Sequence, residues 1–171
     1  TITNGNAGNA GGGYIHDADP SLSNLKIMGN TGANGGGISA QQSNSILTDM
    51  TIKENSSANG GGIFSNGSDL NLTNVVISNN SATGQFDDEE NEYGSGGGLF
   101  NQFSSPSLTQ VTITNNTVRD SGSAIYNAYS FPIVTNSILW NNVGTDAIAF
   151  KQDGSADITI TYSDILGGWE G

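Results

Sequence analysis

Cysteine is absent from this 171-residue sequence, so no disulfide bond can stabilise its fold. Basic residues are scarce as well: four stand against 16 acidic residues, which gives a net charge of −12. A chain without a basic surface cannot neutralise phosphate groups, which excludes nucleic acid as a partner and disfavours anionic lipid. No apolar run approaches the roughly 18 residues of a membrane-spanning helix, so we expect no membrane insertion by this segment.

Apolar residues are also few, at 34% of the chain, while glycine occurs 25 times. A compact globular core normally needs more apolar residues. Composition alone would favour disorder, but the apolar residues recur at fixed intervals, which argues against it. A repeat protein reconciles the two observations, because each coil of such a protein needs only a thin apolar lining.

One apolar column defines the repeat: Ile2, Ile27, Ile52, Ile77, Ile113, Leu139 and Ile165. Its spacings are 25, 25, 25, 36, 26 and 26 residues, so one interval contains an 11-residue insertion. A second apolar column consists of Leu22, Leu47, Leu72, Leu108, Val134 and Ile160. A third consists of Leu25, Met50, Val75 and Val111, and serine takes its place in the last two coils, at Ser137 and Ser163. A fourth follows the glycine runs and consists of Tyr14, Ile38, Ile63, Leu99, Ile125 and Ile148.

This periodicity predicts the fold. No segment has the apolar spacing of a helix over 11 or more residues, whereas short β-rich pieces alternate with glycine turns. The consensus of a leucine-rich repeat is missing, and a propeller blade needs about 40 residues. The sequence therefore predicts an all-β, right-handed parallel β-helix (β-solenoid) of about six to seven coils, each of about 25 residues. Residues 1–171 form one domain, which we interpret as a fragment of a longer protein.

An asparagine column accompanies the apolar ones: Asn30, Asn55, Asn80, Asn116 and Asn142. A buried asparagine in a turn can both donate and accept hydrogen bonds, and stacked asparagines can bond to one another. We interpret this column as structural rather than as a ligand site.

The repeats resemble a known family. Gly60-Gly61-Gly62-Ile63 and Gly96-Gly97-Gly98-Leu99 alternate with Ile77-x-x-Asn80 and Ile113-x-x-Asn116. These motifs are similar to the GG(A/L/I) and FxxN repeats of polymorphic outer-membrane proteins, with Ile in place of Phe. More broadly, they resemble right-handed parallel β-helix modules of secreted bacterial proteins with a pectin-lyase-like fold. The resemblance implies a secreted or cell-surface protein, often an adhesin and often part of a larger chain.

The insertion holds the main charge cluster, and its carboxylates are candidate Ca²⁺ ligands: Asp87, Asp88, Glu89, Glu90 and Glu92. Ca²⁺ takes several oxygen ligands, although the spacing does not match an EF-hand loop. The alternative is a solvated acidic loop. Insertions into a solenoid map to loops on one face, often the binding face. The 85–93 loop is therefore also a candidate for partner recognition, and we expect no cofactor other than this possible Ca²⁺.

An aromatic column follows the glycine-run column by one residue: Ile15, Ser39, Phe64, Phe100, Tyr126 and Ala149. If Ile63 and its equivalents point inward, strand alternation places Phe64, Phe100 and Tyr126 on the outer face, as a platform for a glycan or a protein partner. The alternative is that these rings stack inside the core.

Catalytic groups are not evident. We expect no shared column among the candidate acids Asp17, Asp19, Asp49, Asp69 and Asp120, and the lone histidine, His16, is typical of a surface turn. A hydroxyl ladder (Ser23, Thr48, Thr73, Thr109, Thr135 and Thr161) would suit ice binding only beside a second threonine rank, and the neighbouring rank is mixed.

We therefore expect a non-enzymatic extracellular or cell-surface scaffold or adhesin segment that binds a glycan or a surface protein. The alternative is a lyase- or hydrolase-like module acting on acidic polysaccharide.

Overall fold

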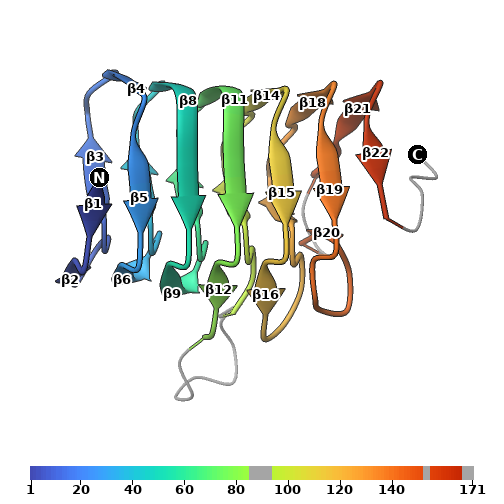
Figure 1. Ribbon diagram of the computed structural model, residues 1–171. Coiled ribbons are helices and arrows are strands. Elements are labelled where there is room, and N and C mark those ends of the chain that lie inside the picture. Colours follow the sequence, from blue (N-terminus) through green and yellow to red (C-terminus); the bar gives the residue numbers. More distant parts are fainter. Residues whose placement is uncertain (85–93, 152–154, 167–171) are drawn as a thin grey trace.

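The protein is a β-solenoid, described by a computed structural model for residues 1–84, 94–151 and 155–166. These residues form 22 strands and no helix, arranged in three parallel sheets that run along the axis of the coil (Figure 1). The all-β solenoid expected from the sequence is confirmed, with about six turns of about 25 residues each. No helix in the described part of the chain is long and apolar enough to cross a membrane.

The largest sheet, sheet A, has 11 strands. It consists of β1 (Ile2–Thr3), β4 (Ser21–Ser23), β5 (Lys26–Met28), β8 (Ile46–Lys53), β11 (Asn71–Ser78), β14 (Ser107–Thr109), β15 (Thr112–Thr114), β18 (Ile133–Thr135), β19 (Ile138–Trp140), β21 (Thr159–Thr161) and β22 (Asp164–Ile165). The long strands β8 and β11 each correspond to two short strands in the other coils.

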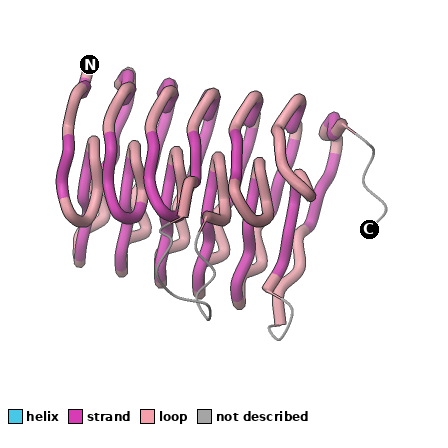
Figure 2. The backbone as a smooth tube through the Cα atoms, turned by 90° about the horizontal axis from the view of Figure 1, so that it is seen from below, coloured by secondary structure: helices cyan, strands magenta, loops and turns pink. Residues whose placement is uncertain are grey.

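The other two sheets have five and six strands. Sheet B consists of β2 (Asn6–Ala7), β6 (Thr31–Asn34), β9 (Ser56–Asn59), β12 (Ser81–Ala82) and β16 (Thr117–Val118). Sheet C consists of β3 (Gly13–His16), β7 (Ile38–Gln41), β10 (Ile63–Asn66), β13 (Leu99–Gln102), β17 (Ile125–Ala128) and β20 (Ile148–Phe150). Figure 2 shows successive turns stacked along the axis.

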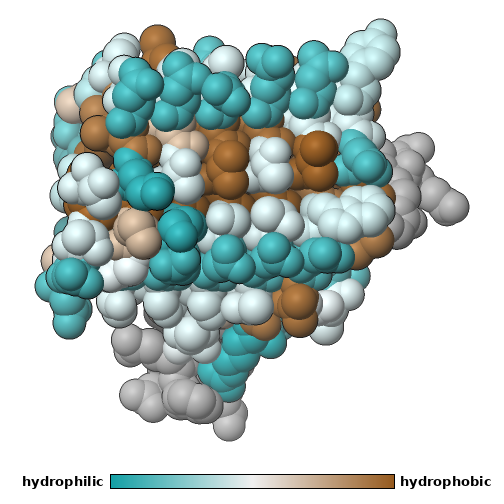
Figure 3. All heavy atoms as spheres, viewed as in Figure 1, coloured by the Kyte–Doolittle hydropathy of each residue, from teal (hydrophilic) through white to brown (hydrophobic). Residues whose placement is uncertain are grey.

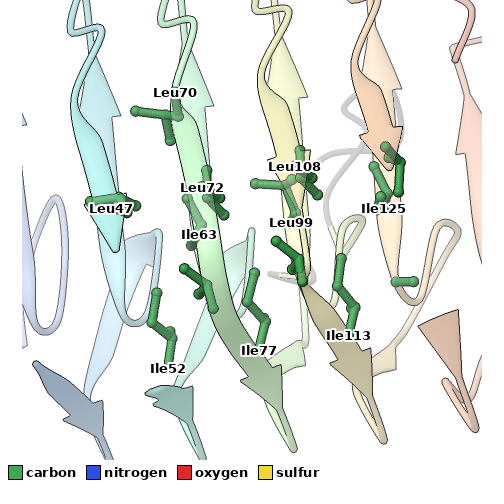
Figure 4. Close-up of a cluster of buried hydrophobic side chains, with 14 of the residues drawn as sticks. Leu47, Ile52, Ile63, Leu70, Leu72, Ile77, Leu99, Leu108, Ile113 and Ile125 are labelled. Atoms are coloured by element: carbon green, nitrogen blue, oxygen red, sulfur yellow. The ribbon is translucent and has the colours of Figure 1, made fainter. Parts of the chain in front are cut away.

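The strand register confirms the columns of the sequence. Ile27 pairs with Ile52, Ile52 with Ile77, and Ile77 with Ile113, so the insertion leaves the pairing of its flanking coils unchanged. Like residues stack along a narrow interior, where Leu47, Leu72 and Leu108 are fully buried (Figure 4). Each coil adds only a few apolar residues to this core, which explains how so polar a chain folds.

Left-handed residues turn the chain within each coil. Asp49 has a φ of 53° inside β8, and Asn74 has a φ of 54° inside β11. Asparagine and aspartate tolerate this conformation better than other side chains that carry a Cβ. After Asp49 the alternation restarts, with Met50 buried and Thr51 half-buried, so one extra residue bends the sheet without interrupting its core face.

The asparagine column forms a continuous hydrogen-bond ladder. Asn55 Nδ2 donates to Asn80 Oδ1, and Asn80 Nδ2 donates to Asn116 Oδ1, each at 3.0 Å. The same oxygens accept the backbone N–H of the preceding asparagine, at 3.0 and 2.9 Å. The ladder therefore satisfies buried turn groups from coil to coil, which bears out the structural interpretation of this column.

A serine ladder explains why one apolar column stops. Ser137 Oγ accepts the backbone N–H of Val111 at 3.0 Å, and Ser163 Oγ accepts that of Ser137 at 3.1 Å. Each serine hydroxyl also donates to a carbonyl two residues before it. In the last coils, hydrogen bonds therefore replace apolar packing at this position.

The first coil is shifted by one residue from the register expected from the sequence. Gly13, not Tyr14, pairs with Ile38, so Tyr14 pairs with Ser39 and Ile15 with Ala40. Ile15 packs against the core, while Tyr14 is exposed. The 24-residue spacing between Tyr14 and Ile38 was the sign that these two residues do not share a column.

Candidate functional site

The aromatic column predicted as a binding platform is buried. Phe64, Phe100 and Tyr126 are 6%, 4% and 3% exposed. Their rings stack at centroid distances of 5.2 and 4.9 Å, and they form an apolar cluster separate from the main core. The rings lie on the outer face of sheet C, as strand alternation predicts. The prediction that they are exposed, as a binding platform needs, is wrong.

Glycine turns account for this burial. Gly96 and Gly122 have φ values of 69° and 68°, and a Cβ on either would lie 2.7–2.8 Å from the Cβ of Phe100 or Tyr126. The turn that leads into each sheet C strand thus folds back over the first outward side chain of that strand. Both faces of sheet C are covered there, and the rings offer almost no surface to a ligand.

The predicted Ca²⁺ ligands Asp87, Asp88, Glu89, Glu90 and Glu92 lie outside the described residues, so their Ca²⁺ role stays a prediction. Within the described ranges, no group of three or more His, Cys, Asp or Glu side chains is placed to hold a metal ion.

Two aspartates do share a column, contrary to the expectation from the sequence. Asp19 Oδ1 accepts the backbone N–H of Asn44, Asn44 Oδ1 accepts that of Asp69, and Asp69 Oδ1 accepts that of Ser105, at 2.6, 2.8 and 2.6 Å. The 50-residue separation of the two aspartates, two repeats of 25, was the available signal. These carboxylates are exposed and bond turn amides, so they belong to a structural ladder rather than to an acid–base pair.

His16 lies at the surface, as expected. Its Nδ1 is 3.0 Å from Asp17 Oδ2, and its ring centroid is 5.9 Å from that of Tyr14. Both side chains are well exposed, which is ordinary for a surface turn.

The hydroxyl ladder lies on sheet A as predicted. Thr48 pairs with Thr73, Thr73 with Thr109, and Thr135 with Thr161. The neighbouring outward rank is mixed, as read from the sequence, since Val76 pairs with Thr112 and Thr112 with Ile138. Figure 3 shows this face, with a row of hydrophobic side chains between rows of more hydrophilic ones.

Sheet A carries exposed apolar side chains on its early coils, at Ile2, Ile46 and Val76, and on its later coils. Ile133, Ile138 and Trp140 are 52%, 46% and 38% exposed. They belong to β18 and β19, which pair with β14 and β15. We call the outward side chains of these four strands the late sheet A face.

The four strands themselves carry no charged side chain, and the nearest charge at their edge is the exposed Asp164 of β22, which pairs with Ile138. The only ionisable charges between residues 104 and 145 are Arg119 and Asp120, which lie outside the four strands, although the whole chain has a net charge of −12. Hydroxyl and amide groups surround the apolar side chains there, among them Thr109, Thr135 and Asn136. An uncharged, partly apolar surface on a strongly acidic protein is the most distinctive chemical feature of the outer face.

An aromatic pair, of which Phe103 is exposed and Tyr129 is half-buried, lies where sheet C turns into sheet A. The Phe103 and Tyr129 rings stack at 4.9 Å with an interplanar angle of 5°. Neither residue was singled out in the sequence, although both follow a sheet C strand and their 26-residue spacing matches the repeat.

Comparison with known proteins gives no relative: no protein-family model, no curated protein and no solved structure matches this chain.

Proposed function

We propose that the protein is a non-enzymatic extracellular or cell-surface scaffold that binds a neutral glycan on the late sheet A face. The observation that carries this proposal is the combination of exposed Ile133, Ile138 and Trp140 with a charge-free hydroxyl ladder. We include in this proposal the family of the protein, a pectin-lyase-like module akin to the repeats of polymorphic outer-membrane proteins. This assignment rests on the glycine and asparagine motifs of the sequence.

Charge selects the class of ligand. An anionic polymer approaching a protein with a net charge of −12 is repelled, whereas a neutral one is not. The apolar faces of pyranose rings pack on aliphatic and indole side chains, and their hydroxyls bond to the threonine and asparagine groups beside them. The ranks of sheet A run parallel to the solenoid axis, so an extended chain can contact several coils.

The acidic loop at 85–93 is proposed as a further contact to a protein partner, and its carboxylates as ligands of Ca²⁺. The alternative function, cleavage of acidic polysaccharide, receives no support from the described residues: Asp19 and Asp69, which share a column two coils apart, accept hydrogen bonds from turn amides.

Binding to an array of neutral and acidic polysaccharides tests the proposal. Trp140→Ala is expected to weaken the binding of a neutral glycan roughly 10- to 100-fold, since an interface tryptophan often contributes about 1–3 kcal/mol. Tyr14→Ala is the matched control, because Tyr14 is an aromatic residue on the first coil of sheet C that is 46% exposed, against 38% for Trp140.

Two results would refute the proposal: Trp140→Ala binding as tightly as the wild type, or a preference for acidic polysaccharides. Release of oligosaccharides from an acidic polysaccharide would instead favour the enzymatic alternative.

A further inference from the structure

The residues that follow the strands of sheet C form one left-handed column. Asp17, Gln42, Gly67, Phe103 and Tyr129 have φ values of 50°, 51°, 58°, 49° and 52°. Glycine, asparagine and aspartate adopt this conformation most readily, whereas bulky side chains there are genuine outliers. Phe103 and Tyr129 at such positions therefore place two rings on strained backbone at the corner between sheets C and A, with Phe103 exposed and Tyr129 half-buried against the aromatic cluster.

The two rings continue the repeat as a parallel stack. Their centroid distance of 4.9 Å matches the roughly 4.8 Å spacing of neighbouring strands. On one side the stack is closed by Lys151, whose Nζ lies 5.6 Å from the Tyr129 centroid. Phe103, at the other end, is 58% exposed.

The next position of the column is Gly67, which has no side chain. Gly67 is exposed, and a Cβ built on it would meet only Gln42 Cγ, at 3.9 Å, within 4 Å. One repeat of the stack is thus vacant between the outer face of the Phe103 ring and the side chain of Gln42. A ring placed there, one strand spacing from Phe103, would continue the stack directly over Gly67.

We propose that this vacant position binds one pyranose ring of a neutral sugar. The Phe103 ring packs against the apolar face of the sugar, and side-chain amides lie beside it to bond the sugar hydroxyls. These amides belong to Gln42, which is exposed, and to Asn66 and Gln102, which are half-buried on the neighbouring outward column. An aromatic ligand ring would leave these amides unused, and an anionic sugar would face the exposed Asp69 carboxylate. The site shares its ligand class with the proposed function but none of its residues.

Filling the vacancy tests the site. Gly67→Asn occupies it with a residue that tolerates a φ of 58°, and Phe103→Gly removes the ring while relieving the strained conformation. Gly29→Asn is the matched control: Gly29 also has a positive φ, 64°, and its Cβ would meet nothing closer than Thr3 Oγ1 at 3.7 Å. Calorimetric titration uses neutral hexasaccharides of glucose, galactose and mannose as probes.

The expected result is that Gly67→Asn and Phe103→Gly each weaken binding of at least one hexasaccharide by 10-fold or more, while Gly29→Asn binds like the wild type. Unchanged binding in the first two variants would overturn the inference, as would a wild type that binds none of the probes.

Trp140→Ala, titrated in parallel, separates the two surfaces. Binding lost only in Trp140→Ala would support the late sheet A face and remove the Gly67 site. Binding lost only in Gly67→Asn and Phe103→Gly would do the reverse.

Discussion

Removal of one rung of the asparagine ladder should cost much of the stability of the fold. Asn80 is fully buried, and its side chain makes four hydrogen bonds. Its Oδ1 accepts from the backbone N–H and from Nδ2 of Asn55, both at 3.0 Å. Its Nδ2 donates to Ile52 O and Asn116 Oδ1, also at 3.0 Å.

Asn80→Ala deletes all four bonds. A typical intramolecular hydrogen bond contributes about 1 kcal/mol, and a buried group left without a partner costs about 1–3 kcal/mol. The N–H and Nδ2 of Asn55 and the carbonyl of Ile52 lose a partner together. We therefore expect the free energy of unfolding to fall by about 3–5 kcal/mol. Asn80→Asp should cost at least as much, because it buries a carboxylate against the Ile52 and Asn116 oxygens.

Urea unfolding followed by circular dichroism measures the loss, taken from the midpoint at constant slope. Asn71→Ala is the control, since Asn71 is an exposed asparagine on the same strand-and-turn unit and should change stability by no more than about 0.5 kcal/mol. A loss below about 1 kcal/mol for Asn80→Ala would refute the view that the ladder holds the coils together.

Four further predictions concern glycine packing, the aromatic stack, an unpaired hydroxyl and the insertion. Gly62→Ala should destabilise by about 1–3 kcal/mol, because its Cβ would lie 2.6 Å from a backbone oxygen of the next coil. Gly13→Ala should stabilise the fold by about 0.5 kcal/mol, because a Cβ on Gly13 meets nothing within 4 Å. Equal urea midpoints for the Gly62→Ala and Gly13→Ala variants would contradict this prediction. Phe100→Ala removes the middle ring of the buried stack and should cost about 3–5 kcal/mol with loss of near-ultraviolet circular dichroism, whereas an unchanged spectrum would argue against the stack. Ser39→Ala should raise the melting temperature and the free energy of unfolding, the latter by about 1 kcal/mol, because within the described residues the buried Ser39 Oγ has no hydrogen-bond partner. A lower melting temperature would contradict this prediction. Titration with Ca²⁺ should release or absorb heat and raise the melting temperature if the 85–93 carboxylates bind it, and neither change would be seen for a solvated acidic loop.

The sequence by itself determined the repeat, and with it the fold. A 25-residue period forces equivalent residues to stack, so the leucine, isoleucine and asparagine columns could be read directly and are confirmed as strand pairs and ladders. Handedness stays a prediction. Register was misread only where a spacing departed from the period, at Tyr14, and where a shared column was overlooked, at Asp19 and Asp69.

The tertiary structure alone decided which side chains reach the surface. Alternation along a strand says that Phe64 and Ile63 point to opposite faces, but not whether the outer face is covered. Coverage depends on how the preceding turn packs, and the glycine turns at Gly96 and Gly122 bury the rings predicted to be exposed. The same dependence on turn conformation exposes Phe103, where the left-handed backbone carries its ring outward next to a position without a side chain.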